Sequence, residues 1–233
     1  MSNIAFLTTI FPMNEGFLHD FFNSLDKQTY KEFDIVVVND GYEDFKNIKL
    51  KYVNDLNIIE LTFSGTPSKN REYGINYCIE NNYDVLIFGD SDDYFSDNRV
   101  ELSLNTLKEN DIVVNDISLF NDTGIYEEKY ISNRLNDNSK ISYEYIQNKN
   151  IFGLSNTAIK LDILEEVVFD EDLLAVDWYL YKRLLKNGYS SLFINKAITF
   201  YRQYEGNAVG LQVGDGKYYL WWEQKNGKIN EIN

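Results

Sequence analysis

The chain has 233 residues, of which 44% are hydrophobic, so it can bury one substantial core and we expect a single compact domain. Its formal charge of −15 argues against nucleic acid as a partner, because phosphates need a basic surface, and against electrostatic docking on anionic lipid. The single cysteine, Cys78, allows no disulfide within one chain, and the sequence shows neither a signal peptide nor an apolar run of about 18 residues. We therefore expect a cytoplasmic protein without a membrane span, for which only peripheral membrane association stays open.

Strands and helices alternate through the first 120 residues. Apolar runs predict strands at 4–9, 33–38, 58–63, 85–89 and 111–118. Helical spacing of apolar residues predicts helices at 17–25, 68–81 with Ser68 as N-cap, and 99–109. Strands that are apolar throughout and alternate with helices are typical of an α/β fold, in which helices cover both faces of a mostly parallel, Rossmann-like sheet.

The second half of the chain, residues 121–233, is less regular. An Asn-rich stretch runs to about residue 150, with a short helix predicted at 142–147. A clear amphipathic helix at 176–187 ends at Gly188, and two strands are predicted after it, at 191–194 and 197–201. We expect residues 1–120 to form one α/β half and residues 121–233 a second half with a C-terminal lid or tail.

An unusual motif follows the apolar strand at 85–88. After Gly89 come Asp90, Ser91, Asp92 and Asp93. Carboxylates at alternate positions can converge on one hard divalent cation, and a cation with open positions can bind two oxygens of a diphosphate. Asp90 and Asp92 are therefore candidate metal ligands, although a polar turn after a buried strand would have the same composition.

Other candidate residues also follow predicted strands. Ligands of open α/β sheets bind beyond the carboxyl ends of the strands, where this chain has Thr8 and Thr9, Asp40, and the loop that leads to Arg71. Asp40 can accept a hydrogen bond from a base or a ribose hydroxyl, and Arg71 can pair with a phosphate. Taken singly, they are also consistent with a turn aspartate and a solvated helix arginine.

With these residues in hand, the chain resembles the family 2 glycosyltransferases of the GT-A fold. Order and spacing match that family over roughly residues 4 to 115, and five motifs in register are far more specific than any one of them. The matching segments are Thr8-Thr9, Gln28-Thr29-Tyr30, Ile35 to Gly41, Asn70-Arg71-Glu72-Tyr73-Gly74-Ile75 and Asp90-Ser91-Asp92-Asp93.

The resemblance implies a nucleotide-diphosphate sugar as donor, with a UDP-sugar the expected one, and a glycan or glycolipid as acceptor. It implies Mn²⁺ or Mg²⁺ as cofactor, with Asp92 the direct ligand and Asp90 beside it. Around the donor it places Thr8 or Thr9, Asp40, Arg71, Asp90, Ser91 and, where the family often has a histidine, Arg202. Ile10-Phe11 departs from the Tyr-Asn that the family often has, and Phe11 is a candidate for stacking on the base.

The resemblance also implies an acidic base at the start of a later helix. Asp177 matches that base, with Arg183-Leu184 further on, although Val176 stands where the family usually has Glu. A helix N-cap is the alternative role for Asp177, and Glu171 and Asp172 are fallback carboxylates. Glu72, where Asn is usual, is a further departure.

The expected reaction is an inverting transfer of the sugar to an acceptor hydroxyl, in the synthesis of a surface polysaccharide or another glycoconjugate. A glycine-rich tail, Glu205 to Trp222, is a candidate lid over donor and acceptor, or else a static element. Two alternatives stay open, a catalytically inactive nucleotide-sugar binding module and a sugar-phosphate nucleotidyltransferase. The second requires a glycine-rich, Arg-containing loop after the first strand, where this chain has Thr9-Ile10-Phe11-Pro12-Met13.

Overall fold

A computed structural model describes residues 3–52, 54–171 and 175–204 of the chain. Its elements, in chain order, are β1 (Ile4–Ile10), α1 (Glu15–Asp26), β2 (Asp34–Asn39), α2 (Phe45–Tyr52), β3 (Asn57–Thr62), α3 (Pro67–Glu80), β4 (Val85–Phe88), β5 (Tyr94–Phe95), α4 (Arg99–Leu107), β6 (Ile112–Asn121), β7 (Gly124–Glu127), η1 (Glu144–Ile146), β8 (Thr157–Lys160), η2 (Leu161–Ile163), α5 (Val176–Lys186) and β9 (Ser191–Arg202).

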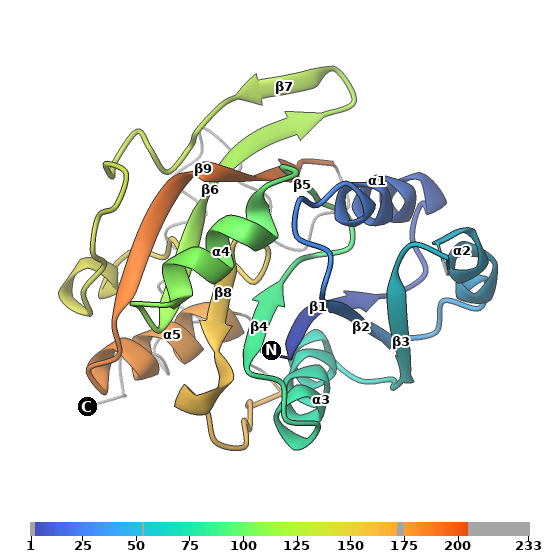
Figure 1. The fold of residues 1–233 in the computed structure, drawn as a ribbon, viewed down its shortest axis with the longest axis horizontal. Helices are drawn as coiled ribbons and strands as arrows, with labels where there is room; N and C mark the ends of the chain where they lie inside the picture. Colours follow the sequence, from blue (N-terminus) through green and yellow to red (C-terminus); the bar gives the residue numbers. More distant parts are fainter. Residues whose placement is uncertain (1–2, 53, 172–174, 205–233) are drawn as a thin grey trace.

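The strands form one sheet in the order β3-β2-β1-β4-β8-β6-β9-β5, and β7 pairs with β6 in a hairpin that projects from the body of the fold (Figure 1). β1 to β4 are parallel to one another, and β9 is parallel to β6. Antiparallel pairs are made by β5, β7 and β8. The predicted α/β class is confirmed, and β8 joins the first half of the chain to the second because it lies between β4 and β6.

Each face of the sheet has its own hydrophobic core. On one face, α3 and α5 bury side chains such as Ile75 and Trp178 against the strands. On the other face, α1, α2 and α4 bury side chains such as Phe21, Phe45 and Val100. The sheet is therefore covered on both sides, and its polar strand ends remain as the place where functional side chains can gather.

The start of α3 differs from the prediction. Thr66, and not Ser68, is the N-cap, because the Thr66 hydroxyl accepts from the backbone N–H of Lys69 and Pro67 already lies in the first turn. Ser68 lies inside the helix and is buried. α3 packs closely on β1 because Gly74 has no side chain: a Cβ there would lie 2.6 Å from Leu7 Cδ1.

Other differences concern short or bent elements. The two strands predicted at 191–194 and 197–201 are one strand, β9, whose pairing with β6 shifts register between Asn115 and Asp116. The sequence pattern predicted neither α2 nor β5, β7 and β8. These elements are short and mix polar with apolar residues, so neither an apolar run nor a helical spacing stands out in them.

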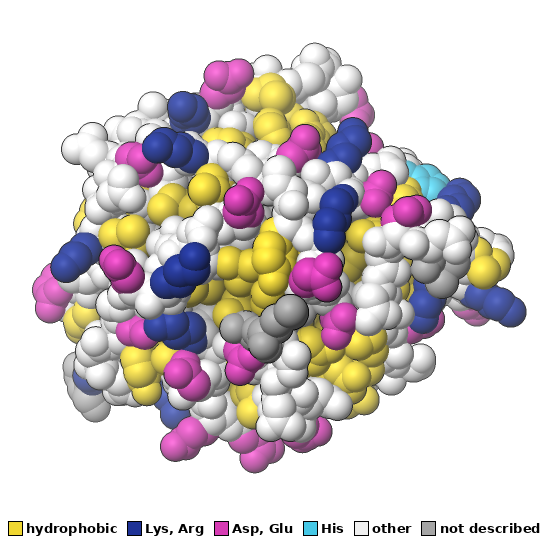
Figure 2. Space-filling view, in the orientation of Figure 1, with side chains coloured by type: hydrophobic (Ala, Val, Ile, Leu, Met, Phe, Trp, Pro, Cys, Tyr) yellow, Lys and Arg dark blue, Asp and Glu magenta, His cyan; other side chains and the backbone are white. Residues whose placement is uncertain are grey.

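The predicted tail lid, Glu205 to Trp222, and the fallback carboxylate Asp172 lie outside the described residues. Within the described ranges, no helix is long and apolar enough to cross a membrane. On the face shown in Figure 2, basic side chains are scattered among acidic ones.

Candidate active site

The C-terminal ends of β2 and β4 meet the first turns of α3. Arg71 donates from Nη2 to Asp90 Oδ1 at 3.2 Å, and both side chains are about a quarter exposed. Its neighbour Asn70 donates from Nδ2 to Asp40 Oδ2 at 2.7 Å. Three predicted site residues from separate motifs therefore lie on the same small surface, beside the buried Asn70, which the prediction left without a role of its own.

The turn from Asp90 to Asp93 is held from two sides. Ser91 Oγ donates to the carbonyl of Thr9 at 2.8 Å, which ties the turn to the end of β1. The backbone N–H of Asp90 donates to Ser155 Oγ at 3.2 Å. Gly89 precedes the turn because a Cβ there would lie 2.5 Å from the Phe6 ring. Ser91 therefore positions the turn, with its hydroxyl facing the backbone of β1.

Asp93 stabilises the turn from inside the protein. Its side chain is fully buried and accepts hydrogen bonds from the Ser155 hydroxyl and from the backbone N–H of Arg202, the latter at 2.9 Å. Burial, together with the charges of Asp92 and Asp90, raises the pKa of Asp93 well above its usual range. Because its oxygens point into the protein, Asp93 braces the turn and is not available to a ligand.

A buried cation lies under the same turn. Arg99, on α4, is fully buried and donates from Nη2 to the carbonyl of Phe88 and from Nε to Asn115 Oδ1. Its guanidinium lies 4.2 Å from the centroid of the Phe95 ring. Burial lowers the pKa of Arg99 to about 9, and the nearby carboxylates, Asp93 first among them, act against this shift. Arg99 was not predicted as part of the site, because an arginine at the start of a helix is usually solvated.

Asp92 is the partly buried carboxylate of the turn. Burial first, and then the charge of Asp90, raise its pKa to about 6, while a hydrogen bond with Tyr204 acts in the opposite direction. Arg202 donates from Nε to the backbone carbonyl of Asp92 at 2.7 Å and from Nη2 to Asp20 Oδ2 at 2.6 Å. Arg202 therefore lies beside the motif, and its contact with the backbone of Asp92 helps to hold the turn in place.

Asp177 lies in the first turn of α5 and is close enough to Arg71 and Asp90 for their charges to act on it. Ala175 occupies the N-cap position, so the proposed capping role of Asp177 is wrong. Its Oδ1 accepts from the backbone N–H of Trp178 at 2.7 Å. Burial raises the pKa of Asp177 to about 6, and Arg71 and Asp90 lie close enough to shift it in opposite directions. Glu171, a predicted fallback, is exposed.

The remaining predicted donor contacts lie at the end of β1. Thr9 is partly exposed and Phe11 is 47% exposed, so both can meet a ligand. Thr8 is 2% exposed, and among the described residues its hydroxyl is one of the buried polar groups without a hydrogen-bond partner. The structure thus turns Thr9 and Phe11 to the surface and Thr8 into the protein.

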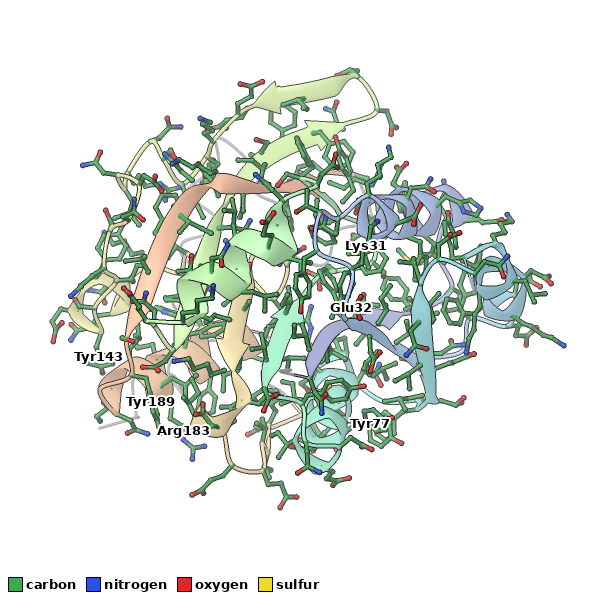
Figure 3. All side chains as sticks on the ribbon, in the orientation of Figure 1. Lys31, Glu32, Tyr77, Tyr143, Arg183 and Tyr189 are labelled. Atoms are coloured by element: carbon green, nitrogen blue, oxygen red, sulfur yellow. The ribbon has the colours of Figure 1, made fainter. Side chains whose placement is uncertain are left out.

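One helix, α3, also holds the segment that leads to Asp177. Asn76 exchanges two hydrogen bonds of 2.8 Å with the backbone of Val167. Glu72, where the sequence departs from the family pattern, accepts from the backbone N–H of Phe169 and from Lys69. In contrast, Arg183 lies further along α5 and is exposed at the edge of the fold (Figure 3).

The donor set at the end of β4 fits a hard divalent cation. Within residues 3–52, 54–171 and 175–204, no group of three or more His, Cys, Asp or Glu side chains is placed to hold a metal ion alone. Mg²⁺-type sites, however, commonly use one or two carboxylates together with substrate phosphates and water. Asp90 and Asp92 provide two such carboxylates. Burial first, and then the charge of Asp90, raise the pKa of Asp92, and a bound cation would act against both by favouring the ionised carboxylate.

The sequence profile of one known family, described as glycosyl transferase family 2, matches residues 10–167, more than half of the chain. The chain belongs to glycosyl transferase family 2. A curated relative, "Glycosyltransferase GlyA" of Streptococcus pneumoniae serotype 4, is 28% identical over 222 residues. That match covers 86% of this chain and 31% of the relative, so the chain spans about a third of that protein.

Solved structures show the same fold at lower identity. S. aureus TarS 1–349 in complex with UDP-GlcNAc has a TM-score of 0.73 and 18% identity, over 98% of this chain and 67% of TarS 1–349. The same protein with UDP has a TM-score of 0.69 and 20% identity, over 86% and 60%. GalNAc-T7 with UDP, GalNAc and Mn²⁺ has a TM-score of 0.65 and 12% identity, over 87% and 44%. This family 2 chain therefore has a GT-A-like fold.

Proposed function

We propose that the chain is a metal-dependent, inverting glycosyltransferase that moves a sugar from a UDP-sugar to an acceptor hydroxyl. One observation carries the proposal: Arg71 on α3 donates to Asp90 at the end of β4 at 3.2 Å, beside the pair of Asn70 and Asp40. The guanidinium of Arg71 would meet the diphosphate, and Asp177, which is near enough to Arg71 and Asp90 for their charges to affect its pKa, would accept the proton of the acceptor hydroxyl. Family membership and the UDP and UDP-GlcNAc bound by TarS support the choice of donor.

The donor half of the site would hold the nucleotide and the leaving group. Phe11 and Thr9 lie at the end of β1 for the base, and Asp40, held by Asn70, can accept from the base or the ribose. Arg71 would pair with the diphosphate as negative charge develops on it. A cation held by Asp92 and Asp90 would supply further electrostatic stabilisation of the same leaving group. Ser91, Arg202 and Asp93 contribute by holding the turn rigid.

The acceptor half would activate the nucleophile. A sugar hydroxyl is a weak nucleophile, so a carboxylate must take its proton during attack. Asp177 is suited to this role because its pKa of about 6 leaves it ionised at neutral pH and more basic than a solvated aspartate. A single displacement with a base opposite the leaving group inverts the configuration at the anomeric carbon.

The broader setting follows from the same chemistry. The acceptor would be a glycan or glycolipid, used in the synthesis of a surface polysaccharide or another glycoconjugate, and the reaction would take place in the cytoplasm. An inactive nucleotide-sugar binding module remains the second candidate, since Val176 replaces the usual Glu and is buried in the core. The loop after β1 does not favour a nucleotidyltransferase, because it lacks glycine and arginine.

Donor turnover tests the proposal and separates it from the inactive module. A panel of UDP-sugars would be incubated with the protein and Mn²⁺, and the released UDP measured with and without a hydroxyl acceptor. The enzyme should release UDP from at least one donor, and Asp92→Asn should abolish the release. A binding module would bind at least one UDP-sugar and release no UDP from any member of the panel.

A further inference from the structure

A cavity lies outside the candidate active site, between α1, β5 and β9. Its volume is about 860 Å³. The residues that matter for its chemistry are Asp20 and Asn23 on α1, Lys27 after it, Tyr94 on β5, and Lys196 and Phe200 on β9. None of these residues was predicted as part of a site, and Arg71 and Asp177 do not line the cavity.

Aromatic rings form one wall of the cavity. Tyr94 and Phe200 face each other across paired strands, and their rings stack with centroids 4.4 Å apart and planes 12° apart. The Phe120 ring packs edge-on against Tyr94 at 4.9 Å. Tyr94 and Phe200 remain partly exposed although they sit on a strand pair. Aromatic rings that line a cavity and stay partly exposed offer an apolar surface to a ligand with apolar C–H groups of its own.

The rim of the cavity is polar and balanced in charge. It carries the carboxylates of Asp20 and Asp97 and the ammonium groups of Lys27 and Lys196, in a chain whose net charge is −15. Asn23 is exposed, and its Oδ1 accepts from the Tyr52 hydroxyl, which leaves its Nδ2 to donate to a ligand. A balanced rim favours neither an anion nor a cation. It suits a neutral molecule with many hydroxyl groups and apolar C–H faces, which describes a saccharide.

The cavity adjoins the metal motif through one residue. Asp20, on its rim, accepts from Arg202 at 2.6 Å, and Arg202 donates to the backbone carbonyl of Asp92 at 2.7 Å. We propose that this cavity is a second, non-catalytic saccharide-binding site, which holds part of a neutral glycan beside the catalytic surface. The proposal rests on the proposed function for the source of that glycan, namely the acceptor or the product. Binding itself requires neither donor nor metal.

Nuclear magnetic resonance titration of the full chain tests the proposal. The probes are maltotetraose, cellotetraose and chitotetraose, each added at millimolar concentration without nucleotide or metal. At least one should shift the amide signals of Tyr94 and Phe200. Phe200→Ala, which removes half of the stacked wall, should weaken that binding about tenfold, and Asn23→Ala should also weaken it. Tyr126→Ala, which removes an exposed ring on β7 outside the cavity, is the matched control and should bind like the wild type.

Three results would overturn the proposal: no shift with any probe, shifts confined to the surroundings of Arg71 and Asp177, or wild-type affinity in both cavity variants. If Phe200→Ala does not fold, Asn23→Ala decides, because it changes an exposed helix position. UDP titrated with Mg²⁺, which is diamagnetic, into the same samples reports separately on the catalytic surface. Failure of the glycan site with intact UDP binding would therefore be distinct from failure of the proposed function.

Discussion

Replacement of Asp177 by Asn should remove activity and at the same time stabilise the protein at neutral pH. The carboxylate is partly buried in the first turn of α5, and its pKa is raised from 3.8 to about 6, mainly by burial. A group with a raised pKa in the folded state favours folding while it is protonated, and this contribution is lost as the pH rises through about 6. Asn is isosteric, remains neutral, and can still accept from the N–H of Trp178.

The size of the effect follows from the same shift. One pKa unit corresponds to about 1.4 kcal/mol, so the difference between 3.8 and about 6 sets an upper bound of about 3 kcal/mol. Allowing for relaxation around the ionised group, Asp177→Asn should raise the free energy of unfolding at pH 8 by about 1 to 3 kcal/mol. The gain should shrink below pH 6 and vanish near pH 4. Sugar transfer should fall by about 100-fold or more, the usual effect of removing a general base.

Urea unfolding at pH 8 and pH 4, combined with donor-binding and transfer assays at saturating Mn²⁺, measures all three quantities. The reasoning predicts a more stable variant that binds the donor normally and does not transfer the sugar. In the wild type, the transfer rate should fall as the pH is lowered through about 6, because Asp177 then becomes protonated. A variant that is less stable at pH 8 and transfers sugar at the wild-type rate would show that Asp177 is a structural residue and would refute this account.

Other predictions concern the metal motif and its support. Asp92→Asn should leave the protein folded and abolish Mn²⁺-dependent UDP release, whereas activity that survives in EDTA would contradict the metal assignment. Asp93→Ala should lower the free energy of unfolding by about 2 to 3 kcal/mol, because the Ser155 hydroxyl and the Arg202 N–H would be left buried without an acceptor, and unchanged stability would disprove its bracing role. Donor affinity in calorimetry should fall both on removing the cation and in Arg71→Met, and equal affinity in EDTA and Mn²⁺ would count against this account.

The first half of the fold was predictable because its central strands are apolar along most of their length. β1, β2 and β4 are buried on both faces, so their sequences are continuous apolar runs with polar residues at the ends. The same ends provide Asp40 and Asp90, and the rule that ligands bind beyond parallel strands was enough to group them with Arg71. For these residues, the position at the end of an apolar strand is enough to predict that they lie at the site.

The parts that could not be predicted depend on contacts between distant segments. β8 is four residues long, and its place between β4 and β6 results from pairing on both edges. In the sequence, Asp93 cannot be told apart from the other two aspartates of the motif. Its hydrogen bonds with Ser155 and Arg202, which are distant in sequence, show that it is buried and stabilises the turn. Thr8 and Thr9 are neighbours of the same type, and only the pleat of β1 decides which of them faces a ligand.

The most direct test of the central claim is a structure of the chain with UDP and Mn²⁺. The account predicts the cation between Asp92 and the diphosphate, Arg71 within hydrogen-bond distance of a phosphate oxygen, and the base between Phe11 and Asp40. A nucleotide bound elsewhere, or a diphosphate that contacts neither Arg71 nor the cation at Asp92, would contradict the account.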